Sequence, residues 1–484
     1  MSETVFHFNG IDGLTGKPLV PAATLTQVLK WIKLTDEQEP DEAKDAHQTT
    51  FDARFVDPAV GVRGLITSAN AYDIGSARWG VVYHPDTPEL VLQKLQPLVD
   101  KRCGLMIEYQ PEVDGDDALK FRGRFDQGPG LVNPRKLPYY LLIVASPEQI
   151  SYTFQYSLDA EHAVGRLYFE TADEYESYVK RLLAYEDQPV RQRRVVFFAP
   201  KNEVDRATYL SANYLVEPLV NALKISAVFK QPYHFDFITG ADAKRDVLLD
   251  ALTRSDDQPA LVFTATHGLG FSAAPFAVQQ ARQGALLCSD WIAAANEAPA
   301  AAIPEKAYLS GEAITAARQC DGLIVFAFGC YTAGTPRYDS FQHLNDDAPH
   351  LLAPHPLVSY LPQRLLAQGA LAFIGHVDKA LDYSFISKDK AVGQDIETFQ
   401  SGLECILRGD PIGYAFEAFN HRWLDLAQYV TQRNDNSLLS RHLKGYKINT
   451  EQLAYYWTAH NDARAYVIFG DPFVRLQPDR LSPA

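Results

Sequence analysis

This 484-residue sequence has few cysteines, fewer basic than acidic side chains, and no long apolar run. Its five cysteines are scattered without a Cys-x-x-Cys pair. That argues against a disulfide scaffold or a structural zinc site and predicts a reducing, cytoplasmic location. The start of the chain shows no basic segment followed by an apolar run, so no secretory signal is expected. No stretch approaches the roughly 18 apolar residues of a membrane span, so no membrane partner is expected.

Acidic residues outnumber basic ones by 60 to 45, which gives a formal net charge of −15. This balance argues against nucleic acid as a partner and is compatible with a basic substrate. Hydrophobic residues make up 46% of the chain and charged residues 22%, so most of the chain is expected to fold. No motif indicates a cofactor or a metal ion.

Short apolar runs alternate with helical patterns along most of the chain. The runs are nearly continuous in hydrophobicity, as in strands covered on both faces. They span residues 139–145, 195–199, 261–265, 323–328, 370–374 and 466–469. Helices are expected over 205–223, 241–253 and 362–368. The alternation predicts an α/β fold with a mainly parallel sheet flanked by helices, and a site at the carboxyl ends of its strands.

A boundary is expected near residues 186–194, where a charged stretch separates a helix from a new strand. This divides the chain into an N-terminal region, 1–190, with a smaller α/β subdomain, and a second domain, 191–484. The first hundred residues show the weakest pattern.

Two of the expected strands run into chemically reactive residues. The run 261–265 leads to His267 and Gly268, and the run 323–328 leads to Gly329 and Cys330. Each pattern alone has a plainer explanation, because a cysteine after a strand is usually a small buried side chain and His-Gly is usually a turn. On neighbouring parallel strands, however, an imidazole and a thiol meet at one edge of the sheet.

That meeting suits nucleophilic catalysis. The thiolate is the reactive form of cysteine, and a nearby histidine can remove the thiol proton and later protonate a leaving amine. The attacked carbonyl oxygen becomes negative and needs fixed donors. Because Gly268 has no Cβ, its N–H can approach that oxygen closely, and the N–H of Cys330 is the natural second donor of an oxyanion hole.

The ordered pattern of strand, His-Gly, strand, small residue and Cys resembles clan CD cysteine peptidases, the caspases, separases and gingipains. The sequences AVGRL at 163–167 and FGDP at 469–472 make the gingipain type the nearest likeness, over roughly residues 137–476. The resemblance implies a caspase-like catalytic domain preceded by a non-catalytic α/β subdomain. It also implies a cysteine endopeptidase that acts on protein or peptide substrates through a thioester acyl-enzyme.

The resemblance further implies that the loop over 375–385 lines the specificity pocket. Asp378 and Asp382 would then be its anions and Tyr383 an aromatic wall, which favours Lys or Arg before the scissile bond. Lys379 and Lys388 are close enough in sequence to neutralise both acids. An acidic, small or apolar preference therefore stays open.

A second histidine and two further kinds of function are also compatible with the sequence. His376 is a rival base at the same sheet edge, and no third residue that orients His267 can be assigned. A catalytically silent module that binds or regulates a partner, or a different cysteine hydrolase, would fit the same scaffold. Residues 1–130 resemble no known segment and are expected to hold a sensor, an inhibitory element or a surface for a regulatory protein.

Overall fold

A computed structural model describes residues 4–32, 64–202, 204–253, 258–291, 301–341, 350–386, 395–442 and 449–484. Lys388, one of the two lysines considered for the pocket, lies outside these ranges. Within them, no helix is both long and apolar enough to cross a membrane.

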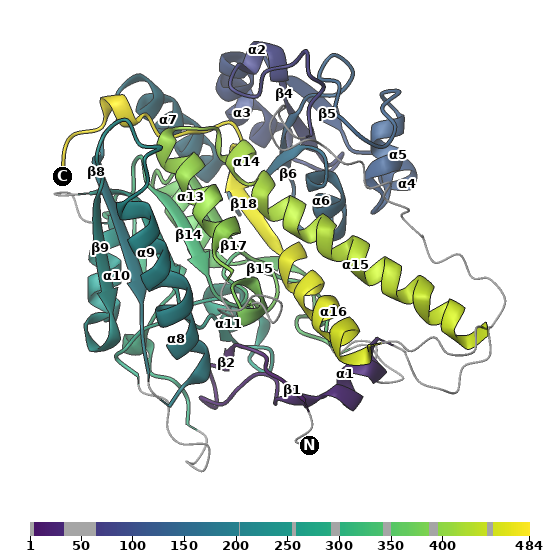
Figure 1. Ribbon diagram of the computed structural model, residues 1–484. Coiled ribbons are helices and arrows are strands. Elements are labelled where there is room, and N and C mark those ends of the chain that lie inside the picture. The colour runs from purple at the N-terminus through teal and green to yellow at the C-terminus, as the bar shows by residue number, and fades with distance from the viewer. Residues whose placement is uncertain are drawn as a thin grey trace.

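A sheet of ten described strands forms the centre of the molecule (Figure 1). Its order is β5 (Leu105–Glu108), β4 (Trp79–Tyr83), β6 (Tyr140–Val144), β7 (Ala163–Leu167), β18 (Tyr466–Gly470), β17 (Ala372–His376), β14 (Ile324–Phe328), β10 (Pro259–Ala265), β8 (Gln192–Ala199) and β9 (His234–Thr239). Among these strands, only the β17–β18 pair is antiparallel. The expected α/β fold with a mainly parallel sheet is confirmed.

The antiparallel pair divides the sheet into two halves that run in opposite directions. Strands β17, β14, β10, β8 and β9 share one direction, so their carboxyl ends lie at the same edge. Strands β5, β4, β6, β7 and β18 run the other way. The edge that carries His267 and Cys330 is therefore formed by the carboxyl ends of β17, β14, β10, β8 and β9.

Helices flank both halves of the sheet (Figure 1). The larger ones are α3 (Glu89–Arg102), α6 (Tyr152–Asp159), α7 (Ala172–Asp187), α10 (Arg245–Thr253), α12 (Tyr360–Ala367), α13 (Glu397–Arg408), α15 (Glu417–His442) and α16 (Thr450–Arg464). Local sequence sets their ends. A capping box of Thr171 and Glu174 begins α7, and Gly409, with a φ of 92°, ends α13.

The helix expected over 205–223 is interrupted. It consists of α8 (Arg206–Leu210), a π-helical turn (Ser211–Val216) and α9 (Glu217–Lys224). Pro218 lacks an N–H and its ring would clash with the carbonyl four residues earlier, so the wide turn directly before it removes the conflict. Asp205 caps the start of α8 through its side chain.

The carboxylate of Asp471 joins the end of β18 to β4 and α3. Asp471 is fully buried directly after β18 and accepts hydrogen bonds from Trp79 Nε1 (2.8 Å) and Arg102 Nε (2.9 Å). The FGDP sequence thus has a structural task in this chain, because it anchors β18 against the elements that precede residue 190.

Candidate active site

The two reactive residues follow neighbouring strands in register. Ala265 of β10 pairs with Phe328 of β14, and His267 and Cys330 each lie two residues further on. The pairing continues past the strand ends, because Thr266 N–H donates to Phe328 O at 3.1 Å. The structure thus places His267 and Cys330 at the same edge, on adjacent strands.

The backbone directly after Cys330 is strained. Tyr331 has a φ of 58°, although it is a large side chain and fully buried. Such a conformation costs on the order of 1–3 kcal/mol and is concentrated at functional sites. Hydrogen bonds to the loop after β17 stabilise it: Tyr331 N–H donates to Asp378 O (2.9 Å) and Ala333 N–H to His376 O (3.0 Å).

Gly268 lies directly against the backbone of Cys330. A Cβ at this position would be 1.7 Å from Cys330 O and 3.0 Å from Cys330 N, so only glycine fits. The neighbouring backbone groups bond to another segment: Leu269 N–H donates to Ala285 O, and His267 O accepts from Leu287 N–H. Among the described residues, neither Gly268 N–H nor Cys330 N–H has a hydrogen-bond acceptor. Two neighbouring unsatisfied donors are what an oxyanion hole requires.

A carboxylate that the sequence did not predict, that of Asp205, accepts a hydrogen bond from His267. His267 Nε2 donates to Asp205 Oδ2 at 2.7 Å, and the His267 ring is only 5% exposed. Burial alone would raise the pKa of Asp205, but the charge and hydrogen bond of His267, with a bond from Thr208, lower it to about 2. A hydrogen-bonded carboxylate fixes the ring's orientation and tautomer, so that Nδ1 is the basic nitrogen.

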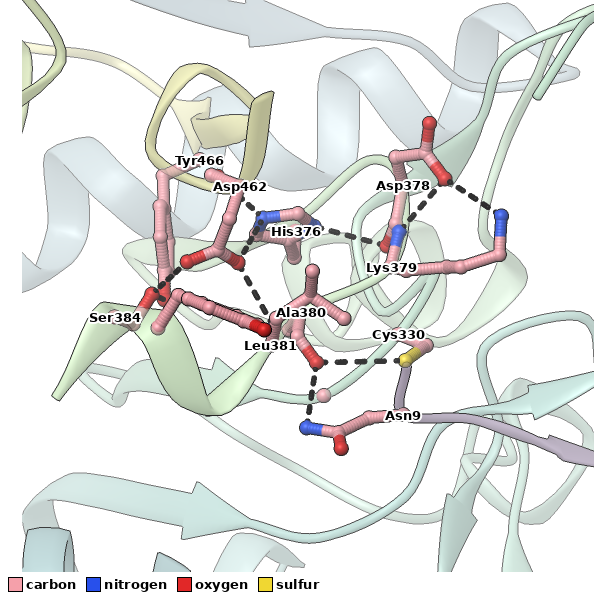
Figure 2. A network of polar contacts seen from close by, with 12 residues as sticks. Asn9, Cys330, His376, Asp378, Lys379, Ala380, Leu381, Ser384, Asp462 and Tyr466 are labelled. Carbon is pink, nitrogen blue, oxygen red and sulfur yellow. Dashed lines mark hydrogen bonds and ion pairs between the residues drawn. The ribbon is translucent and has the colours of Figure 1, made fainter. Parts of the chain in front are cut away.

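His376, the rival base, has a different environment (Figure 2). Its Nδ1 contacts Asp378 O at 2.9 Å and its Nε2 contacts Asp462 O at 2.8 Å. Carbonyl oxygens only accept, so both ring nitrogens donate and neither can take a proton from a thiol in this arrangement. Burial opposes a charge on this ring, but the Asp462 carboxylate outweighs burial and raises the pKa of His376.

Cys330 is held as a neutral thiol. It is 1% exposed, and its S–H donates to Ala380 O at 3.7 Å. Burial raises the pKa of Cys330 to about 12, although the Ala380 bond and the nearby charge of Lys379 oppose the rise. All five cysteines of the chain are unpaired. Within the described ranges, no group of three or more metal-ligating side chains is present.

The residues expected in the specificity pocket are already engaged. The Asp378 carboxylate accepts from the N–H groups of Lys379 (2.8 Å) and Ser340 (3.3 Å). Lys379 Nζ lies 3.6 Å from the same carboxylate and 2.7 Å from Asp339 Oδ2, fully buried. Lys379 thus neutralises Asp378, one of the arrangements that the sequence left open.

Asp382 and Tyr383 lie further along the same loop. Asp382 Oδ2 pairs with Arg206 at 2.7 Å; the carboxylate side chain is 6% exposed and the arginine 46%. Its second oxygen, Oδ1, is buried without a hydrogen-bond partner among the described residues. The Tyr383 ring stacks on Phe6, with ring centroids 6.4 Å apart. Asp382 therefore keeps binding capacity that Asp378 lacks.

Solved structures resemble this fold, although the sequence matches no protein-family model and no curated protein. One, described only as a protease, is 11% identical with a TM-score of 0.46, and the match covers 85% of this chain and 79% of that chain. Another is the Arg-specific cysteine proteinase gingipain R, at 10% identity and a TM-score of 0.44, covering 83% and 78%. A Saccharomyces cerevisiae separase–securin complex gives 9% and 0.33, covering 70% of this chain and 16% of that chain.

Replacing Asp205 with asparagine is expected to lower kcat for peptide cleavage by about a hundredfold or more, because the neutral amide neither stabilises a charged imidazole nor fixes the tautomer. Asp236→Asn is the control, because it removes a His–Asp contact on β9, His234 Nε2 to Asp236 Oδ1 at 3.1 Å, together with the bond that Asp236 accepts from Arg194 Nε. Equal kcat values for the two variants would contradict the role of Asp205.

Proposed function

We propose that this protein is a cysteine endopeptidase that uses Cys330 as nucleophile and His267 as proton-transfer partner. The observation that carries the proposal is the register of β10 and β14, which brings His-Gly and Gly-Cys to one sheet edge. The N–H groups of Gly268 and Cys330 at this edge have no acceptor among the residues that the structure describes. Asp205 adds support, since a third group that orients the base is typical of activated nucleophiles.

The reaction follows from the groups present. His267 Nδ1 removes the proton of the Cys330 thiol, and the thiolate attacks the carbonyl carbon of a peptide bond. Gly268 N–H and Cys330 N–H stabilise the negative oxygen. The C–N bond then breaks, His267 gives its proton to the leaving amine, and a thioester remains. Water, deprotonated by His267, hydrolyses the thioester and regenerates the thiol.

The direct experiment is to incubate the purified protein with a denatured polypeptide and to identify new chain ends by mass spectrometry under reducing conditions. New ends that disappear after alkylation of Cys330 support the proposal. If neither the protein as purified nor its Leu19→Ser, Asn9→Ala variant, described below, cleaves any denatured substrate, the protein is instead a silent binding or regulatory module. Cleavage of small esters or amides without peptide-bond cleavage would indicate another cysteine hydrolase.

The arrangement of the loop after β17 favours Asp382 over Asp378 as the group that selects a basic side chain. One oxygen of Asp382 has no partner in the described part of the chain, and its present partner Arg206 is half exposed and can be displaced by a substrate cation. A charge-assisted hydrogen bond of this kind contributes roughly 1.5–3 kcal/mol. We therefore propose Lys or Arg in the segment before the scissile bond, read by Asp382.

A positional-scanning peptide library tests this specificity. Asp382→Asn should lower the preference for Lys and Arg by about tenfold or more, following the loss of one charge-assisted bond. Asp378→Asn should lower stability without altering the preference, because its carboxylate is already bonded to Lys379 and Ser340. A wild-type preference for aspartate or leucine, or an unchanged profile in Asp382→Asn, would show that the pocket assignment is wrong.

A further inference from the structure

A segment from the start of the chain lies over the nucleophile. Asn9 and Gly10 pass beside Cys330: a Cβ on Gly10 would be 3.2 Å from Cys330 Sγ, and Asn9 Nδ2 donates to Ala380 O at 3.0 Å. This carbonyl oxygen is the one that accepts the Cys330 S–H, so the two donors converge on it (Figure 2). Gly10 has a φ of 107°, which favours glycine at the point of closest approach.

The segment follows the course of an extended peptide through an active site. Directly after Gly10, β2 (Ile11–Asp12) pairs with β11 (Leu269–Gly270), the short strand that continues from His267 and Gly268. Gly13 N–H adds a bond to Gly270 O at 2.9 Å. Pairing of a peptide with an exposed strand edge is a common mode of peptide binding. The chain thus crosses the nucleophile with backbone pairing on the histidine side.

On the other side of the nucleophile, the segment covers the candidate pocket. Phe6 stacks on Tyr383, and the Asp382–Arg206 pair acts on His7, whose pKa is lowered by burial and by Arg206 against the opposing effect of Asp382. Leu19 folds back over the crossing point, where its N–H donates to Gly10 O at 3.0 Å and its side chain packs against the cluster of Cys330, Tyr331 and Leu352.

Further packing holds the segment in place. Apolar side chains of residues 6–31 form a small separate core with Phe341, Leu381 and Ala454 from the rest of the chain. The members from the N-terminal residues are Phe6, Phe8, Val20, Ala23, Val28 and Trp31. Helix α1 (Leu25–Trp31) lies beside α16 at this end of the molecule (Figure 1). The cover over the site is therefore a folded part of the protein.

We infer that residues 6–19 occupy the peptidase's own substrate groove and keep it latent, so that the segment must leave before a peptide is cleaved. The inference rests on the proposed function. With the segment seated, the Cys330 side chain is 1% exposed, and burial disfavours the charged thiolate that attacks a peptide. The crossing backbone occupies the place of the substrate, which explains why an intact catalytic group is found in a closed state.

The test is the rate at which iodoacetamide alkylates Cys330 in the full chain, followed by peptide mapping. Leu19→Ser, combined with Asn9→Ala, removes the packing and the amide donor that hold the crossing point, and alkylation of Cys330 should accelerate at least tenfold. Cys103, which is exposed, and Cys320, which is buried in the main core, serve as internal references. Leu29→Ser is the matched control, since Leu29 is a half-buried leucine of the same small core, away from Cys330.

A Cys330 rate that stays at the wild-type value while Cys320 remains protected would overturn the inference. If Cys320 also becomes reactive, the double variant has unfolded. In that case Asn9→Ala alone, which removes no apolar packing, is measured instead. A severalfold rise in the Cys330 alkylation rate supports the inference, and an unchanged rate overturns it. Peptide cleavage is measured on the same samples. Fast alkylation with cleavage is the expected result, whereas fast alkylation without cleavage would leave the occlusion standing and contradict the proposed function instead.

Discussion

Replacing Cys330 with alanine is expected to abolish peptide-bond cleavage, with a loss of at least about a thousandfold, because no other group at the site can form the thioester. The comparison is made in the Leu19→Ser, Asn9→Ala background, where the groove is open. The fold should survive, since one buried sulfur is removed at a strand end and the cost is about 1 kcal/mol. Thermal unfolding and a fluorogenic or denatured-protein cleavage assay measure both effects.

Cys320→Ala provides the matched control for this experiment. Cys320 is also fully buried and precedes the same strand, β14, but at the opposite end. Its replacement should cost similar stability and leave cleavage unchanged. Undiminished cleavage by a folded Cys330→Ala protein would contradict the nucleophile assignment.

Replacing Gly268 with alanine is expected to have the second largest effect. The new Cβ would be 1.7 Å from Cys330 O, which is backbone and has no room to move without displacing the nucleophile. The backbone of residue 268 or 330 would have to shift, and the N–H groups of the two residues would shift with it. Loss of one oxyanion donor alone lowers kcat by about 10²–10³, and overpacking adds a stability cost of roughly 1–3 kcal/mol.

Gly123→Ala is the contrasting variant, because Gly123 lies in the helix α5 (Ala118–Gly123) with no atom within 4 Å of an added Cβ. That change should leave kcat unchanged and stabilise the helix slightly. Steady-state kinetics and thermal unfolding of both variants give the comparison. If Gly268→Ala keeps the kcat of the parent protein, the assignment of Gly268 N–H to the oxyanion hole is wrong.

The strands that carry the site were accessible from sequence because they are buried on both faces and read as continuous apolar runs. The runs at 195–199, 261–265 and 323–328 correspond to β8, β10 and β14. Strands β4, β5, β7 and β9 were not predicted. β5 and β9 are the edge strands of the sheet, Leu105 and Met106 of β5 are exposed, and β4 follows a stretch of turns, so hydrophobicity does not set these three strands off from their neighbours.

Within the site, chain order along parallel strands predicted where His267 and Cys330 would lie, since strand register fixes the positions of the residues just beyond each strand end. Asp205 was missed although a signal exists: it caps the first helix after β8, the strand beside β10, and so emerges at the same edge. The crossing of Asn9 and Gly10 left no such signal, because a two-residue strand pairing across more than 250 residues depends on tertiary contacts alone.

The loop acids illustrate a second limit. Sequence showed that Lys379 could neutralise the loop acids, but not that Arg206 and Asp339, from distant parts of the chain, pair with Asp382 and Lys379. The local pattern of charges therefore left open which carboxylate stays available, whereas the folded chain leaves one oxygen of Asp382 without a partner among the described residues.

The central claim, that Cys330 is a nucleophile activated by His267, is tested most directly by covalent labelling. The opened variant is incubated with a peptidyl acyloxymethyl ketone that carries arginine next to the electrophile, and its intact mass and tryptic peptides are measured. We expect a single adduct on Cys330, formed much faster than with a simple alkylating agent of equal reactivity and lost in His267→Ala. Labelling that spreads over several cysteines, or that continues at the same rate on Cys330 without His267, would contradict the account.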